Sequence, residues 1–319
     1  MKSTLKIVYM GTPEFAVEPL RVLLENGYNI VAVVAAPDKP AGRGRELKQP
    51  EVKQFALAHH LPVLQPEKLR DENFIATLKS LNADLFLVVA FRMLPEIVWS
   101  MPPKGTVNLH ASLLPDYRGA APINHAIING ETTTGVTTFV ITHEIDTGEI
   151  FLQKKVEIGI DETAGELHDK LMIAGASLLL ETVEKIESGE IKPFSQPETA
   201  DIHPAPKLFR ENCEIDWNLP AERVRNLIRG LSPSPGAWCE LKNDTKSLQI
   251  KILKASVDSE KTNGELSGTI CSNGKNFLKI ACADRFLNVE ELQPQGKKIM
   301  PVKAFLAGFR DITSYRSGK

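Results

Sequence analysis

The first 190 residues of this 319-residue chain alternate segments typical of strands with segments typical of helices, and this order constrains the fold more than any other feature. Short apolar runs at 5–11, 29–36, 84–90 and 106–111 predict strands, and amphipathic segments separate most of them. The run 84–90 is apolar almost throughout, which is typical of a parallel strand covered on both faces. The alternation predicts an α/β domain with a doubly wound, mostly parallel sheet.

The ends of the expected helices carry recognisable signals. Thr12 is a good capping residue and Pro13 suits the first helical position, so a helix is expected to start there and to stop near Gly27. The segment 37–50 is expected to be a polar loop. We also expect helices near Pro50, at 67–81 and at 163–187, and further strands at 135–141 and 149–158, while 61–66 is a short apolar piece before the helix at 67–81.

The pattern changes after residue 190. Residues 191–207 contain four prolines and few apolar side chains, which is typical of a linker. Beyond them, a helix is expected at 220–230, followed by short apolar runs at 236–241, 248–257, 268–272, 276–282 and 286–292. A small antiparallel barrel of the oligonucleotide-binding (OB) type is the simplest fit. We therefore expect an α/β domain at 1–190, a linker at 191–207 and a barrel domain at 208–319.

Charge and apolar content exclude several classes of protein. The longest apolar runs are under ten residues, so no membrane span is expected. No signal peptide precedes the first strand, so we expect a cytoplasmic protein, with a monomer as the default state. The net charge of −2 divides unevenly: residues 1–207 hold 20 Lys and Arg against 27 Asp and Glu, whereas residues 208–319 hold 18 against 13. The basic second part favours a nucleic-acid partner.

Two common kinds of site are not indicated. The turn 11–15 (GTPEF) lacks the glycines of a dinucleotide fingerprint and the chain has no G-K-[ST], so the fold alone gives no reason to propose NAD or ATP. The chain has four cysteines, Cys213, Cys239, Cys271 and Cys282, and none of them forms a C-x-x-C pair. We therefore expect reduced, mostly buried thiols and no metal site.

Polar residues on the strand expected at 106–111 indicate a site. Asn108 and His110 are two residues apart, so their side chains point to one face, while Leu109 points to the other. Polar side chains on a buried strand are costly unless they are paired or functional. The segment 112–122 is punctuated by Ser, Pro and Gly, and its backbone groups are expected to be free for a ligand. A structural Asn and a buried, hydrogen-bonded His remain the alternative.

A carboxylate follows on a neighbouring expected strand. Asp146 begins a D-T-G turn and lies 36 residues after His110, so the two side chains could converge. An Asn, a His and an Asp at one point would suit acyl transfer: a neutral donor for an oxyanion, a proton carrier, and a carboxylate that holds the imidazole. An ordinary turn-forming Asp remains the alternative.

At these residues the sequence resembles the folate-dependent formyltransferase family. Asn108-Leu-His110, the following segment SLLPDYRGAAPI and the later Asp146-Thr-Gly are similar to that family's hallmark. The resemblance covers essentially the whole chain, and GTPEFAV, PDKPAGRGRELKQP, HPAPKLFRENCEIDW and LQPQGKKIM are most similar to the branch that acts on methionyl initiator tRNA. The resemblance implies a formyltransferase catalytic domain and a tRNA-binding barrel. It implies formyl transfer from 10-formyltetrahydrofolate to the α-amine of the methionine, without a metal.

The resemblance also assigns roles to residues. Asn108 and His110 would stabilise the oxyanion, and Asp146 would orient His110 and help to take up the proton of the amine. Folate contacts are implied for Ser112, Leu113, Leu114, Pro115, Phe91, Arg92 and Met93. Contacts with tRNA are implied for Lys39, Arg43, Arg45, Lys48 and Lys207. Departures from the common family pattern lie at Asp116-Tyr117 and at 91–93, beside the site.

Two other functions stay open at this point. The same Asn, His and Asp could formylate a small amine, such as a nucleotide-linked amino sugar or glycinamide ribonucleotide, although such an acceptor needs neither the basic loop nor the barrel. The chain could also be a non-catalytic RNA-binding module with a decayed enzyme domain, although the three site residues are intact.

Overall fold

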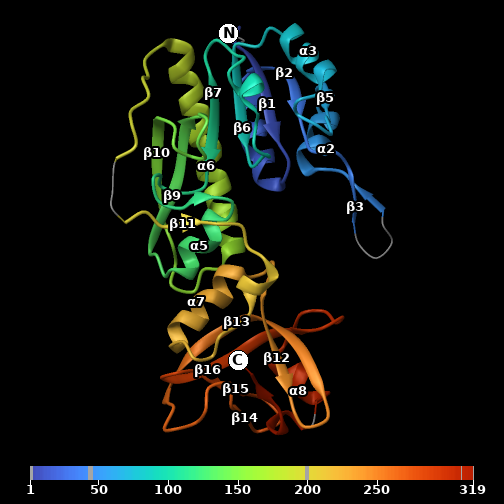
Figure 1. Cartoon of the computed structure of the whole chain (residues 1–319), viewed down its shortest axis with the longest axis vertical. Coiled ribbons are helices and arrows are strands. Elements are labelled where there is room, and N and C mark those ends of the chain that lie inside the picture. Colours follow the sequence, from blue (N-terminus) through green and yellow to red (C-terminus); the bar gives the residue numbers. More distant parts are fainter. Residues whose placement is uncertain (1–2, 42–45, 198–200, 310, 319) are drawn as a thin grey trace. The chain divides into compact units, whose positions relative to one another are not determined.

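The computed structural model describes residues 3–41, 46–197, 201–309 and 311–318. The chain divides into two compact units (Figure 1). The first unit comprises Met1–Gly119, Thr133–Glu157 and His168–Pro204, and the second comprises Ala120–Thr132, Ile158–Leu167 and Ala205–Lys319. Two early segments thus belong to the second unit, and the boundaries expected at 190 and 208 stay predictions.

A mixed sheet forms the centre of the first unit. Its described strands lie in the order β10-β9-β7-β6-β1-β2-β5. The strands are β1 (Lys6–Gly11), β2 (Asn29–Val34), β5 (Val63–Leu64), β6 (Leu85–Val89), β7 (Thr106–His110), β9 (Thr133–Val140) and β10 (Ile150–Glu157). Strands from β7 to β5 pair in parallel, whereas β9 and β10 add an antiparallel edge. The prediction of a doubly wound, mostly parallel sheet is confirmed.

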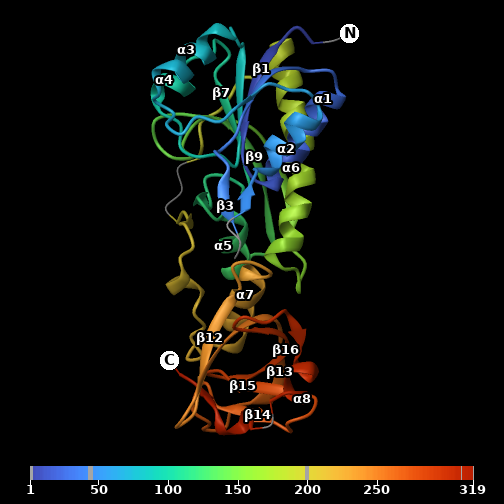
Figure 2. The ribbon, with the colours of Figure 1, turned by 90° about the vertical axis from the view of Figure 1, so that its right-hand side faces the viewer.

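Helices cover both faces of this sheet. The helices α1 (Val17–Glu25), α2 (Glu51–Ala58) and α6 (Ala164–Ser188) lie on one face, and α3 (Glu72–Ser80) and α4 (Glu96–Trp99) lie on the other (Figure 2). Val8 and Met10 of β1 join Phe74 and Leu78 of α3 in one buried cluster, while the intervening Tyr9 donates its hydroxyl to the carbonyl of Ala16 at 2.6 Å. The period of two in a strand thus separates the two halves of the core.

The sequence order of the strands reverses between β1 and β6. From β1 the chain proceeds outward through β2 and β5, and then crosses back to β6 and β7 on the other side. In an open α/β sheet, ligands bind beyond the carboxyl ends of the strands at such a reversal. The residues that follow β1, β6 and β7 therefore occupy the favoured position for a site.

Local expectations for the helices and the loop are wrong at several points. Thr12 does not cap α1, because a 3-10 turn, η1 (Glu14–Ala16), comes first and Ala16 is the N-cap residue of α1. The helix expected from 67 begins at Glu72, where the Asp71 side chain accepts from Phe74 N at 3.0 Å. The segment 37–50 carries an antiparallel hairpin, β3 (Lys39–Ala41) and β4 (Glu46–Lys48), instead of a loop alone.

An antiparallel sheet and a few short helices form the second unit. Its sheet has the order β14-β15-β16-β13-β12-β18, with β17 paired to β16. The strands are β12 (Ala237–Lys242), β13 (Ser247–Lys261), β14 (Ile270–Ser272), β15 (Leu278–Ala281), β16 (Arg285–Pro294), β17 (Met300–Pro301) and β18 (Arg316–Ser317). The helices are α5 (Pro122–Ile128), α7 (Ala221–Leu231), α8 (Val302–Ala307), η2 (Arg210–Cys213) and η3 (Ile312–Ser314). Elsewhere the chain forms β8 (Arg118–Gly119) and β11 (Pro204–Ala205).

The two ends of the second sheet meet, which gives the barrel-like closure that the sequence predicts. Thr269 forms an antiparallel bridge with Arg316 of β18, and Ser317 N donates to the carbonyl of Gly268 at 3.0 Å. Gly268 has a φ of +81°, and a Cβ atom there would clash with the carbonyl oxygen of Ser317. Only glycine fits this closing contact.

The cysteines differ in their exposure, and all four lie within the described residues. Cys213, Cys239 and Cys282 are buried, whereas Cys271 is exposed, so the expectation of mostly buried thiols is confirmed. Burial raises the pKa of Cys239 and the pKa of Cys282 to about 12. Burial also raises the pKa of Cys213.

We expect a thiol reagent at pH 8 to modify Cys271 rapidly in the folded protein and the other three cysteines only after denaturation. The thiolate is the reacting form, and a raised pKa lowers the thiolate fraction at pH 8. The stoichiometry can be followed by absorbance or by mass spectrometry, with Cys271→Ser as the control that removes the rapid reaction. Rapid modification of two or more thiols in the folded protein would contradict the burial.

Candidate active site

Strand β7 places Asn108 and His110 on one face of the sheet, as predicted. Leu109, between them, faces the opposite side, where a Cβ atom on Gly175 of α6 would lie 2.9 Å from its side chain. Asn108 pairs with Val88 of β6 in parallel and with Phe139 of β9 in antiparallel register. The strand is thus held on both sides, which fixes the direction of both polar side chains.

His110 is buried and lies between two acceptors. Its Nε2 is 2.9 Å from the carbonyl oxygen of Tyr117, so this nitrogen carries a proton and donates it. Its Nδ1 is 3.8 Å from Oδ2 of Asp146, too far for a direct hydrogen bond. Nε2 is thus satisfied by the Tyr117 carbonyl, while Nδ1 faces the carboxylate without a direct hydrogen bond. The position suits a group that carries positive charge during a reaction.

The Asp146 carboxylate is held by the backbone. Its Oδ2 accepts a hydrogen bond from Gly119 N at 2.9 Å. Asp146 has a φ of +56°, a conformation that a non-glycine residue keeps only when its surroundings enforce it. Two residues later, a Cβ atom on Gly148 would clash with the carbonyl oxygen of Val140, so glycine is required in this turn. The structure therefore brings together His110 and Asp146, which are 36 residues apart.

Asn108 has a side-chain amide that is available to a ligand. It makes no hydrogen bond to another described residue and is partly exposed. The backbone of Tyr117 and Gly119 supplies two contacts of the site that the sequence reasoning missed. Backbone groups leave no side-chain signal, and the positive φ of Tyr117 (+61°) follows from the fold of the whole segment.

The stretch from Ser112 to Pro115 is built into the protein more tightly than expected. Ser112 donates its hydroxyl to the carbonyl of Asp116 at 2.6 Å, and Leu114 lies in a buried cluster with Phe139 and Ile150. Leu114 N donates to the Thr137 hydroxyl at 3.2 Å. The expectation that this segment leaves its backbone free is thus wrong in part, and the folate contacts of Ser112, Leu113, Leu114 and Pro115 stay predictions.

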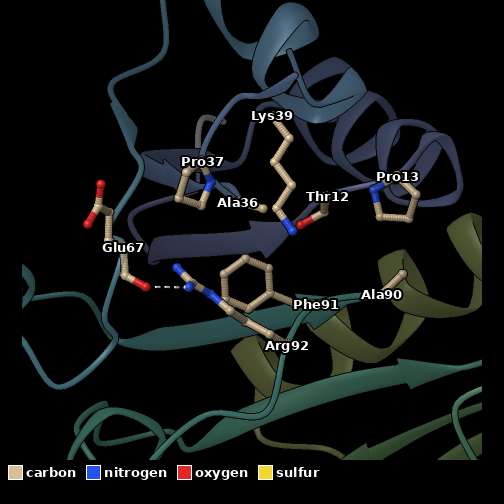
Figure 3. Close-up of a pocket in the computed structure, with 9 residues that line it drawn as sticks. All are labelled: Thr12, Pro13, Ala36, Pro37, Lys39, Glu67, Ala90, Phe91 and Arg92. Carbon is tan, nitrogen blue, oxygen red and sulfur yellow. Dashed lines mark hydrogen bonds between the residues drawn. The ribbon is translucent and has the colours of Figure 1, made fainter. Parts of the chain in front are cut away.

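A cavity of about 660 Å³ lies at the carboxyl ends of β1, β2 and β6, where the strand order reverses (Figure 3). Its walls include residues that follow these strands, namely Thr12, Pro13, Ala36, Pro37, Ala90, Phe91 and Arg92, together with Lys39 of β3 and Glu67 beyond β5. Two of the residues with predicted folate contacts, Phe91 and Arg92, therefore line a cavity, and Met93 next to them is exposed. Asn108, His110 and Asp146 are not among the described residues that line this cavity.

Arg92 has a fixed position in this cavity wall. Its guanidinium donates to the carbonyl of Glu67 at 2.8 Å and to the carbonyl of Pro66. It also lies 5.5 Å from the centre of the Phe91 ring, within the range of a cation–π contact. Burial lowers the pKa of Arg92. The pair gives the cavity one flat aromatic face beside one cation.

The hairpin β3–β4 carries the described part of the predicted tRNA loop. Lys39 and Lys48 lie directly opposite each other in the antiparallel register, and both are exposed. Lys48 also pairs with Glu51 at 2.7 Å, which raises the pKa of Lys48. Arg43 and Arg45 lie outside the described residues, so their roles stay predictions. Like charges on opposite residues cost stability unless an anion compensates them.

The acidic residue at the base of this hairpin does not offset its charge. Asp38 is bonded to Gln65 at 2.7 Å and to Lys53 at 2.7 Å, and these bonds lower the pKa of Asp38. In the second unit, Lys207 is exposed, with its Nζ 5.6 Å from the centre of the Phe209 ring. Each described lysine of the predicted tRNA contacts thus has its side chain in solvent.

The described residues carry no metal-binding cluster and no membrane-spanning helix. No cluster of three or more His, Cys, Asp or Glu side chains in this part of the chain could hold a metal ion. No helix of the described ranges combines the length and apolar character needed to cross a membrane.

The fold and the site define a class of protein, and comparison with known sequences agrees with that class. Residues 5–183 match the formyl transferase family, and residues 207–310 match the formyl transferase C-terminal domain. The chain belongs to the formyl transferase family and is an enzyme of that family.

Relatives within the family are similar over the whole length. The chain is 54% identical to the methionyl-tRNA formyltransferase of Bacteroides fragilis over 319 residues, which cover 99% of this chain and 98% of that one. It is 51% identical to the methionyl-tRNA formyltransferase of Bacteroides thetaiotaomicron, with 99% of each chain covered.

Solved structures share the fold at much lower identity. The sugar 3N-formyl transferase WlaRD superimposes with a TM-score of 0.65 at 21% identity, over 93% of this chain and 100% of that one. HypX from Aquifex aeolicus gives a TM-score of 0.65 at 19% identity, over 96% of this chain and 48% of that one. These likenesses concern the fold.

Proposed function

We propose that this chain transfers the formyl group of 10-formyltetrahydrofolate to the α-amine of methionine on initiator tRNA. The observation that carries the proposal is the arrangement of Asn108, His110 and Asp146 at the end of β7. The buried His110 ring lies between a carboxylate and a carbonyl, and the Asn108 amide beside it is available. The whole-length similarity to methionyl-tRNA formyltransferases supports this choice of acceptor.

The reaction needs no protein nucleophile, because the acceptor is itself an amine. The amine nitrogen attacks the formyl carbon, and a tetrahedral intermediate with a negatively charged oxygen forms. Collapse of the intermediate breaks the bond to N10 of the folate; the amine loses a proton and N10 gains one. The catalytic demand is thus stabilisation of one oxyanion and transfer of one proton.

Each of the three side chains meets one part of this demand. The Asn108 amide donates to the oxyanion. The protonated His110 donates from Nδ1, since Nε2 is already bonded to the Tyr117 carbonyl. At 3.8 Å, Nδ1 makes no direct hydrogen bond to the Asp146 carboxylate, so it remains available to donate to the oxyanion. Asp146 stabilises the positive charge on His110 and takes up the proton that the amine releases.

The donor and the acceptor are assigned to adjoining parts of the first unit, since Lys39 of the hairpin also lines the cavity. The cavity beside Phe91 and Arg92 offers an aromatic face and a cation, which suits the pteridine ring and polar edge of a folate. The hairpin that carries Lys39 and Lys48 suits the phosphates of an acceptor stem, because both lysines are exposed. Lys48 has Glu51 as its ion-pair partner, and Asp38 is bonded to Lys53, which leaves Lys39 as the cation that a phosphate can pair with. A small amine would make no use of this hairpin.

The proposal is tested by a transfer assay with competing acceptors. Purified protein with 10-formyltetrahydrofolate is expected to formylate methionyl initiator tRNA, and not an amino sugar nucleotide or glycinamide ribonucleotide present at equal concentration. Products can be separated by mass spectrometry, with uncharged tRNA as the control that lacks the amine. Equal transfer to one of the small amines would refute the assignment of the acceptor.

A further inference from the structure

The segment that the sequence presents as a linker reaches the active site. Its described residues 191–197 and 201–204 belong to the first unit. Phe194 forms an antiparallel bridge with Ile150 at the start of β10, with hydrogen bonds of 2.9 Å and 2.8 Å between their backbones. Ile150 follows the Asp146 turn by a few residues, so this bridge fixes the segment beside the catalytic carboxylate.

The side-chain amide of Gln196 makes hydrogen bonds through both its nitrogen and its oxygen, and its partners belong to the two backbone segments that hold Asp146. Its Nε2 donates to the carbonyl oxygens of Asp146 and Gly148, at 2.8 Å in each case. Its Oε1 accepts from Nη2 of Arg118 at 2.6 Å. A glutamine amide has two N–H donors, and here both are directed at the two ends of one turn.

These contacts complete a ring of hydrogen bonds around the carboxylate. Gly119, next to Arg118, donates its N–H to the Asp146 carboxylate, while Arg118 itself holds Gln196. Gln196 therefore joins the two backbone segments that determine where the Asp146 side chain lies. Since Asp146 has a φ of +56°, its turn depends on such external contacts to stay in place.

The same segment also contacts the other side of the site. The carbonyl of His203 accepts from Tyr117 N at 2.6 Å, and the two rings stack with their centres 5.7 Å apart. Tyr117 in turn presents its carbonyl to Nε2 of His110. Both acceptors that face the His110 ring are thus supported by residues between 194 and 204.

We propose that Gln196 is a positioning residue for formyl transfer, which holds the Asp146 turn so that its carboxylate faces His110. Gln196 contacts the backbone of the turn and acts on the reaction through Asp146. The inference rests on the proposed function, because it assigns a role within the same site. A displacement of about 1 Å in a catalytic group can cost about 100-fold in rate, so the loss of these bonds has a measurable effect.

The test compares three single variants of the whole chain, Gln196→Leu, Gln196→Glu and Asp146→Asn. It also compares two double variants, in which each Gln196 change is combined with Asp146→Asn. Gln196→Leu removes all three hydrogen bonds, whereas Gln196→Glu keeps the length and the contact with Arg118 but removes both N–H donors. Asn26→Leu is the matched control, because the Asn26 amide donates to the Val22 carbonyl at 2.8 Å at the end of α1, outside the site. The measurements are kcat, KM for each substrate and the melting temperature.

We expect both Gln196 variants to lose about 10- to 100-fold in kcat with unchanged KM values, and Asn26→Leu to keep the wild-type rate. In the Asp146→Asn background, either Gln196 change is expected to cause no further loss, because two residues that act through one group are not additive. Wild-type kcat in Gln196→Glu, or losses that multiply in the double variants, would overturn the proposal. The wild-type rate on methionyl-tRNA tests the proposed function separately, since the role of Gln196 is read from ratios to that rate.

Discussion

Replacement of His110 with alanine is expected to lower kcat by at least about 100-fold, with little change in the KM for either substrate. The imidazole is the proposed source of positive charge for the oxyanion, and this interaction is made only in the transition state. The ring is buried between the Tyr117 carbonyl and the Asp146 carboxylate, and alanine removes its Nδ1 from the site. Steady-state kinetics with saturating methionyl-tRNA measures the effect.

The control for this variant is His59→Ala. His59 is exposed at the end of α2, and its Nδ1 is bonded to the Phe55 carbonyl of its own helix at 3.0 Å. We expect that variant to keep the wild-type rate. His110→Asn, which preserves a polar side chain in the buried position, separates a loss of chemistry from a loss of packing, and is expected to be as slow as His110→Ala. A rate within a few-fold of wild type for both His110 variants would contradict the assigned role.

Asp146→Asn is expected to cost at least about 100-fold in kcat. The substitution keeps the shape of the side chain and an acceptor for Gly119 N, but removes the negative charge 3.8 Å from His110 Nδ1. Both side chains are mostly buried, so solvent screens the lost charge only weakly. The neutral amide also cannot take up the proton that the attacking amine releases.

The chain offers a matched control for the charge change. Asp169 lies 2.9 Å from Nδ1 of His168, so it is also a carboxylate beside an imidazole, but it is exposed and lies on α6. Asp169→Asn is therefore expected to leave kcat unchanged. If the two variants had the same rate, the carboxylate of Asp146 would have no special part in the reaction.

Much of the fold could be predicted because burial imposes a period on the sequence. Strand β6 (Leu85–Val89) is apolar throughout since it is covered on both faces, and the alternation of Asn108, Leu109 and His110 follows from the pleat of β7. The same pleat explains why two of the three catalytic candidates could be named from their spacing. Short elements escaped prediction, because α4, α5 and α8 are too short to show a period.

The rest of the site could not be predicted, because it depends on tertiary contacts. The Tyr117 carbonyl and the Gly119 N–H act through the backbone, which is the same in every residue. Gln196 lies in a proline-rich stretch typical of a linker, and its position 50 residues after Asp146 carries no local signal. Only the path of the chain around the edge of β10 shows that these residues belong together.

The closing contact of the barrel has a consequence for synthesis on the ribosome. The main sheet of the first unit has all its described strands by residue 157, and the contacts of Gln196 and His203 are available by residue 203, so its site can form while later codons are still being read. The barrel cannot close until Thr269 meets Arg316 and Trp217 meets Ser317, 100 residues after that tryptophan. Until then the edge of β14 stays open to pairing with other nascent chains. Translation that stops shortly before residue 316 is therefore expected to release a chain with a complete site and an aggregation-prone second domain.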